Sequence, residues 1–248
     1  MNRRSVGAEL AETLATAARE GFAIGVPADD AELEALFRRL IRERTPGDAV
    51  LGEEIAETTG WDGRGWIIDP IDGTNNYVGG VPFYCVSIAY FEEAQPRLGW
   101  VVDPERRETW FAAAGEGVWC NGKRVAVLEE CRSPKPLVMV SSRWRKRHRS
   151  AAAKLRDRVR DRTFGALALE CAWVAGGRVS AGVWGSARIW DLAAGVLLIS
   201  EGGGYVESCS GGPLAFSRDG EKLREERISF HGGAPALREL LVEHCRTQ

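Results

Sequence analysis

The chain has 248 residues, of which 44% are hydrophobic and 27% are charged, so it can bury one substantial core or two modest ones. Its 33 Lys and Arg residues nearly balance its 35 Asp and Glu residues, and the net charge of −2 argues against a general attraction to nucleic acid or to an anionic membrane. This charge balance fits a small soluble partner better. The six cysteines are scattered and form no C-x-x-C pair, which predicts reduced thiols, and the lack of a long apolar segment predicts a cytoplasmic protein without a membrane span.

The first half of the chain predicts two helices followed by short strands. Apolar residues recur at helical spacing in residues 8–20 and, more strongly, in residues 31–44, where Asp29 or Asp30 stands at the N-cap position. From residue 66 the pattern changes to β-rich runs, and Asn121-Gly122 is typical of a two-residue hairpin turn. The predicted strands are residues 66–69, 85–91, 97–102, 108–113 and 136–142.

The second half alternates helices and strands, a pattern that favours layered α/β packing. The predicted helices are residues 150–161, 165–175, 191–201 and 234–245, and the predicted strands are residues 178–184, 204–207 and 227–231. The sequence shows no internal repeat and no long linker. We therefore expect one compact unit made of an N-terminal lobe, residues 1–145, and a C-terminal lobe, residues 146–248.

The segment WIIDPIDGTNNY at residues 66–77 carries the strongest chemical signal. In it an apolar strand runs into Asp69 and Asp72, and Pro70 between them lacks the N–H that would continue a ladder. The chain must turn there, so both carboxylates and the carbonyl of Ile71 can face one space. Hard oxygen ligands without His or Cys favour a magnesium-like ion. The alternative is that both aspartates are ordinary turn residues.

The two residues after this pair favour an anion site. Gly73 removes a side chain where the backbone must approach a ligand, and Thr74 begins a short turn whose free N–H groups can hold a phosphate.

Two other acidic positions could join the first pair. Glu53-Glu54 follows the apolar run AVLG at residues 49–52, which could carry it to a buried strand end, although a solvated acidic loop is the alternative. Asp191 begins an apolar helix, and its alternative is a simple N-cap.

Taken together, these segments resemble the inositol monophosphatase family of lithium-sensitive, magnesium-dependent phosphatases. GEE at residues 52–54, DPIDGT at 69–74 and WDLAAGVLLISEGGG at 190–204 match the three family signatures in order. The similarity spans nearly the whole chain from about residue 27. It implies a five-layer αβαβα sandwich, an active site shared by both lobes, and a homodimer.

The resemblance also implies metal ligands. Glu53 and Asp69 would bind a first magnesium ion together with the carbonyl of Ile71. Asp69, Asp72 and Asp191 would hold a second ion. A third, weaker ion near Glu53 is a further option.

The same resemblance implies how water is directed at the phosphate. V-P-A-D-D at residues 26–30 occupies the place of a family V-T-x-x-D segment, and its spacing from Glu53 selects Asp30 rather than Asp29. Asp30 would polarise the Thr74 hydroxyl, which orients a water activated by the metal ions, so no covalent phosphoenzyme is needed. Asp30, Thr74 and Glu53 are therefore the predicted catalytic residues.

Around the expected substrate pocket the sequence departs from the family. Trp184 stands where an acidic residue contacts sugar hydroxyls, and Gly165-Ala166-Leu167-Ala168 lacks a small hydroxyl residue, so we expect a more apolar pocket. Arg188 could contact a second phosphate or an acidic group, or could be an ordinary surface arginine. The predicted substrate contacts are Asp72, Gly73, Thr74, Gly165, Trp184 and Arg188.

The implied function is hydrolysis of a small phosphorylated metabolite such as an inositol or sugar phosphate. The alternatives are an adenosine 3′,5′-bisphosphate nucleotidase, a histidinol-phosphate phosphatase, or an inactive regulatory or binding protein with the same fold. The basic run RWRKRHR at residues 143–149 is expected to be a solvated loop rather than a nucleic-acid contact.

Overall fold

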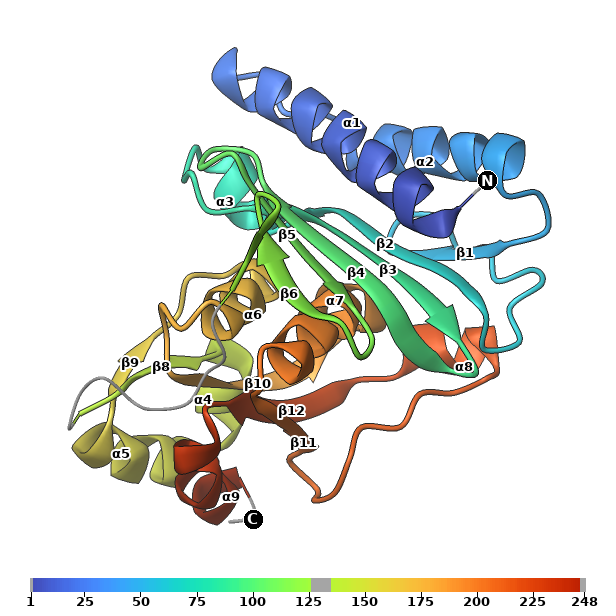
Figure 1. Ribbon diagram of the computed structural model, residues 1–248. Helices are drawn as coiled ribbons and strands as arrows, with labels where there is room; N and C mark the ends of the chain where they lie inside the picture. The colour runs from blue at the N-terminus through green and yellow to red at the C-terminus, as the bar shows by residue number, and fades with distance from the viewer. Residues whose placement is uncertain (1, 126–134, 246–248) are drawn as a thin grey trace.

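The computed structural model describes residues 2–125 and 135–245, which stack as alternating helical and sheet layers (Figure 1). The outer helical layer is followed by a seven-stranded sheet, a central helical layer, a five-stranded sheet and a second outer helical layer. These layers confirm the predicted αβαβα sandwich. The helices of the three helical layers, in order, are α1 (Arg3–Ala23) and α2 (Asp30–Arg44), α6 (Leu167–Ala175) and α7 (Ile189–Glu201), and α4 (Ser142–Arg147), α5 (Arg149–Arg158) and α9 (Arg238–Cys245).

The first sheet follows chain order, with β1 parallel to β2 and every later neighbour antiparallel. Asn121 and Gly122 join its last two strands with positive φ values of 50° and 72°, as the predicted hairpin turn requires. Its strands are β1 (Ala49–Gly52), β2 (Gly65–Asp72), β3 (Cys85–Glu92), β4 (Gln95–Asp103), β5 (Glu108–Ala113), β6 (Gly117–Cys120) and β7 (Lys123–Arg124).

The second sheet has the order β11-β12-β10-β8-β9, in which β8 runs parallel to both of its neighbours. The chain passes from the first sheet to the second between β7 and β8, whereas the lobe division at residue 145 stays a prediction. The strands of this sheet are β8 (Leu137–Val140), β9 (Arg160–Arg162), β10 (Ala181–Ala187), β11 (Tyr205–Ser208) and β12 (Ile228–Gly233).

Strand β2 divides its side chains between two buried apolar clusters. Trp66 and Ile68 pack beneath α1 and α2, and Ile67 packs on the opposite face, against the central helical layer. Because side chains alternate along a strand, Asp69 shares the face of Ile67 and is directed towards α7. The strand continues beyond Pro70 with a shifted register, so proline interrupts the ladder here without ending the strand.

Several local predictions need correction. The basic run at residues 143–149 is not a loop: α4 begins after Ser141, whose hydroxyl accepts from the N–H of the buried Trp144. Neither β9 nor α8 (Gly220–Glu225) was predicted, and the 3₁₀ turn η1 (Pro235–Leu237) forms the start of the last predicted helix.

Two further sequence predictions concern the thiols and the membrane. The described cysteines are free thiols, and Cys131 lies outside the described residues. Within residues 2–125 and 135–245, no helix combines the length and the apolar character needed to span a membrane.

Candidate active site

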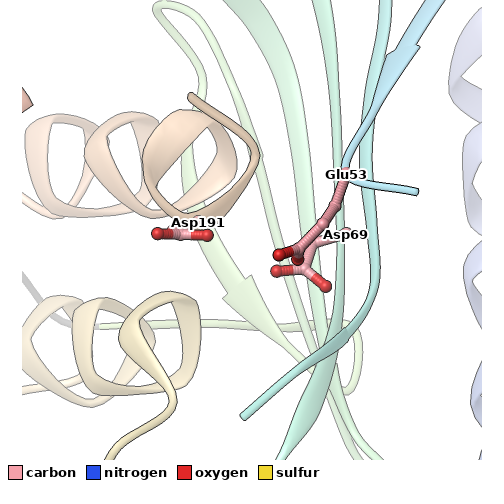
Figure 2. Close-up of side chains that lie close together, drawn as sticks. All are labelled: Glu53, Asp69 and Asp191. Atoms are coloured by element: carbon pink, nitrogen blue, oxygen red, sulfur yellow. The ribbon is translucent and has the colours of Figure 1, made fainter. Parts of the chain in front are cut away.

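Three carboxylates from distant parts of the chain meet between the first sheet and α7. One oxygen from each of Glu53, Asp69 and Asp191 lies within 4.8 Å of the other two. Glu53 follows β1 and Asp69 lies on β2, and Figure 2 shows both side chains extending towards Asp191 on the first turn of α7. The simple N-cap alternative for Asp191 is wrong, because Arg188 holds that position and its N–H donates to Asp191 Oδ2 at 3.0 Å.

The negative charges of this group lie close enough to repel one another. Burial raises the pKa of Asp69 well above its usual value, and Asp72, Glu53 and Asp191 raise it further. Partial desolvation, followed by the charges of Asp191 and Glu54, raises the pKa of Glu53 to about 7. Within the described residues, no Lys or Arg forms an ion pair with the three clustered carboxylates. A hard divalent cation fits this oxygen donor set and would remove the repulsion.

The other two predicted metal ligands lie beside the cluster but also have protein partners. Asp72 lines the same cavity, and its Oδ2 accepts from the N–H of Ala168, in the first turn of α6, at 2.6 Å. Burial and the charge of Asp191 raise the pKa of Asp72. The Ile71 carbonyl accepts from the Thr74 hydroxyl at 3.0 Å.

The predicted contact between Asp30 and Thr74 is present. Thr74 Oγ1 lies 3.3 Å from Asp30 Oδ2, and the N-cap of α2 is Asp29, which accepts from the N–H groups of Ala31 and Glu32, the second and third residues of the helix. Since Asp29 performs the capping, the Asp30 carboxylate is left for Thr74. Burial, followed by the charge of Glu54, raises the pKa of Asp30 to about 6.

The short helix α3 (Thr74–Val78) presents backbone donors to the cavity. Gly73 precedes it with φ at 95°, and a Cβ added there would lie 2.9 Å from the Ala166 side chain, so only glycine fits. The N–H groups of Asn76 and Tyr77 donate to the carbonyl of Gly73. Those of Thr74 and Asn75, which both line the cavity, have no acceptor among the described residues.

The cavity beside the carboxylates has a volume of about 380 Å³. This lies within the range of about 300–1,000 Å³ that is usual for small-molecule sites. Arg188 is not among its described lining residues, because its Nη1 donates to the carbonyls of Arg224 and Glu225 at 2.7 and 3.0 Å. The structure thus places this predicted substrate contact outside the cavity.

The wall around Gly165 and Trp184 contains an acid that the sequence did not reveal. Both residues line the cavity, but Trp184 is fully buried and its Nε1 donates to Glu170 Oε2 at 2.8 Å. Glu170 Oε1 accepts from the N–H groups of Phe164 and Gly165 at 2.8 and 2.9 Å. Together with Ser141, Ser142 and Thr163, which follow strands of the second sheet, Glu170 makes the cavity more polar than predicted.

A buried ion pair supports the loop that carries Glu53. Glu34 and Arg38 on α2 pair at 2.8 Å, and Glu34 Oε2 accepts from the N–H of Glu54 at 2.8 Å. Gly52 makes room for this pair, because a Cβ there would lie 2.3 Å from the Glu34 carboxyl group. From the sequence, charged residues such as these are expected on the solvated face of a helix. Only their i, i+4 spacing indicates that they could pair.

A side chain from α8 holds the other side of the same loop. Arg224 donates to the carbonyls of Glu53 and Ile55 at 2.7 and 3.2 Å, and its guanidinium lies 5.4 Å from the centre of the Trp190 ring. The loop is therefore fixed both to the outer helical layer and to the start of α7.

Comparison with known proteins decides the family. The family model described as "Inositol monophosphatase family" matches residues 8–247. The chain belongs to the inositol monophosphatase family. It is 34% identical over 221 residues to inositol-1-monophosphatase of Bacillus subtilis, a match that covers 86% of this chain and 80% of that protein.

Two other inositol monophosphatase family matches extend this result. Histidinol-phosphatase of Mycobacterium tuberculosis is 36% identical over 196 residues, which cover 75% of each protein. The solved structure of an IMPase from Thermotoga maritima superposes with a TM-score of 0.85 at 27% identity, covering 99% of this chain and 97% of that one. The family resemblance and the layered fold are thus confirmed, and the chain is a phosphomonoesterase.

Proposed function

We propose that this family member is a magnesium-dependent phosphatase of a small phosphorylated metabolite, such as an inositol or sugar phosphate. The observation that carries the proposal is the meeting of Glu53, Asp69 and Asp191 beside a cavity of metabolite size. Glu53 and Asp69, with the Ile71 carbonyl, would hold one ion. Asp69, Asp72 and Asp191 would hold a second, and a third ion near Glu53 is a further option.

The residues of the chain account for the positioning steps of hydrolysis. When bound, the ions neutralise phosphate charge and make water more acidic. The Thr74 hydroxyl has one proton to donate, to Asp30 or to Ile71, so its oxygen can accept from the attacking water and orient it at phosphorus. The N–H groups of Thr74 and Asn75 would bind the phosphate oxygens.

Histidinol phosphate is a second candidate substrate. A relative that matches three quarters of this chain is named a histidinol-phosphatase. Adenosine 3′,5′-bisphosphate remains a further candidate, because the cavity beside the metal residues has room for groups beyond one phosphate.

We also propose a cytoplasmic homodimer that has no nucleic-acid or membrane partner. Among the described residues, the large apolar side chains that are exposed lie in two adjoining segments, Ile24 and Val26 after α1, and Val78 and Val81 around the end of α3. The N–H of Ala28, which donates to the Tyr77 hydroxyl at 2.9 Å, joins these segments. Pairing of two copies through this patch would remove it from water.

A panel of phosphate esters tests the proposed reaction. Inositol 1-phosphate, fructose 1-phosphate, histidinol phosphate and adenosine 3′,5′-bisphosphate would each be assayed for phosphate release with magnesium and with a chelator. We expect magnesium-dependent release from at least one of them. If no ester releases phosphate at any magnesium concentration, the proposal fails and an inactive binding protein of the same fold becomes the better account.

A further inference from the structure

Arg143 lies in the candidate active site, although the sequence places it in a basic run far from every metal motif. Among the described lining residues it is the cavity's sole Lys, Arg or His. It is the second residue of α4, a helix fixed by Ser141, whose hydroxyl accepts from the N–H groups of Trp144 and Gly185 at 3.2 and 2.9 Å. Trp144 is buried under the second sheet, so Arg143 is held on an anchored helix.

The guanidinium of Arg143 keeps most of its hydrogen-bonding capacity. Its Nη1 donates to the carbonyl of Ser186 at 3.1 Å, and the described residues offer it no carboxylate within ion-pair distance. Arginine has five N–H donors in a planar fork that matches a carboxylate or a phosphate. Donors therefore remain for a ligand in the cavity.

Arg143 and the acidic cluster line the same cavity. A ligand in this cavity would therefore meet the positive charge of Arg143 as well as the carboxylates of Glu53, Asp69 and Asp191.

The wall near Arg143 can accept an anion. Ser141 and Ser142 bring hydroxyl groups to the cavity lining, whereas the hydroxyl of Thr163, which also lines the cavity, donates to the carbonyl of Val140 at 2.5 Å. Glu170 also lines the cavity, but its two oxygens accept from three N–H donors, which offset its negative charge. Trp184 is neutral.

We propose that Arg143 binds a second oxyanion of the substrate, a phosphate or a carboxylate, while the phosphate to be hydrolysed lies at the acidic cluster. This inference rests on the proposed phosphatase function and narrows its substrate class. Phosphate esters with a second anionic group become the preferred substrates. Esters with an ammonium group, such as histidinol phosphate, would be disfavoured because Arg143 repels them.

Two matched substrate pairs isolate the effect of a second anionic group on the substrate. Fructose 1,6-bisphosphate differs from fructose 1-phosphate by one phosphate, and 3-phosphoglycerate differs from glycerol 3-phosphate by a carboxylate in place of a hydroxymethyl group. Wild type, Arg143→Gln and Arg143→Lys would be compared with Arg147→Gln. This control makes the same charge change at an exposed position of α4 outside the cavity lining. Thermal unfolding would verify the folding of each variant.

We expect Arg143→Gln to lower kcat/KM for the doubly anionic member of a pair about tenfold or more, mainly through KM, as loss of a charged hydrogen bond implies. The partner with a single anionic group should change by less than about threefold, and Arg143→Lys should lie between wild type and Arg143→Gln. An effect confined to the bisphosphate would identify the group as phosphate, and an effect in both pairs would indicate any oxyanion.

Equal losses for both members of each pair, or no loss for either, would overturn the role of Arg143. So would a wild-type enzyme that hydrolyses the esters with one anionic group as well as those with two. In all three results the phosphatase function stands. If wild type releases no phosphate from any ester with magnesium, the proposed function fails first and this inference fails with it.

Discussion

The contact between Asp30 and Thr74 links the first turn of α2 to the proposed phosphate site. We expect Thr74→Ala and Asp30→Asn each to lower kcat by about 10²- to 10⁴-fold, the usual range for a lost proton-transfer partner, while magnesium affinity stays near that of wild type. Steady-state kinetics and a magnesium titration measure the two effects separately. Asp29→Asn is the matched control, since asparagine also caps helices well and Asp29 does not contact Thr74. Wild-type turnover by Asp30→Asn would contradict the assignment.

The raised pKa values of the site carboxylates predict how stability depends on pH without metal. Asp30 and Glu53 have pKa values of about 6 and about 7, against usual values of 3.8 and 4.5. At pH values between the usual pKa of each group and its raised pKa, the folded protein binds more protons than the unfolded chain. Its free energy of unfolding therefore falls as the pH rises through this range. Magnesium bound as proposed would replace those protons, and its stabilisation should therefore grow with pH.

Thermal unfolding with and without magnesium, at about pH 5 and about pH 8, measures this linkage. We expect the larger rise in Tm at the higher pH, with roughly 2–4 °C for each kcal/mol of stabilisation in a chain of this size. An equal rise at both pH values would show that the site carboxylates do not exchange protons for metal.

At the scale of elements, the loop after β1 depends on two helices that supply no metal ligand. Arg224 from α8 donates to the Glu53 carbonyl at 2.7 Å and so fixes the backbone from which the ligand extends. Because partners that orient a ligand typically contribute 10- to 100-fold in metal affinity, Arg224→Ala should weaken magnesium binding by about that factor. Calorimetric titration with magnesium measures the effect, and Lys222→Ala, at an exposed position of α8, is the control. Unchanged affinity in Arg224→Ala would show that the loop holds Glu53 unaided.

The elements that the sequence predicted well share one property. Apolar periodicity locates helix 31–44 and the strands of the first sheet because each presents a regular buried face. In contrast, β9 is the run Arg160–Arg162, which has no apolar residue and forms as an edge strand through its parallel neighbour β8. Helix α4 was not predicted because Trp144 is its single buried residue and the other residues are polar or charged, so the segment has no apolar periodicity.

Across the whole molecule, local motifs predicted which acids lie together, but not what surrounds them. The alternation along β2 and the helix that begins near Asp191 fix which sides those carboxylates face. The spacing of Asp30 from Glu53 selected the acid that meets Thr74. Glu170 and Arg143 could not be found in this way, because their positions depend on how the second sheet and its helices close the cavity. For the same reason Arg188 was expected in the cavity, whereas its side chain points to the end of α8.

The central claim, that carboxylates from both lobes share divalent ions beside the substrate phosphate, is tested most directly by Asp69→Asn. Asp69 is buried at the meeting point of the cluster, and the amide would keep its size while removing its charge. We predict that phosphate release from inositol 1-phosphate, or from the best ester of the panel, falls at least about 100-fold at saturating magnesium. The variant should remain folded and, without metal, be no less stable than wild type. Near-normal turnover of Asp69→Asn under these conditions would contradict the account.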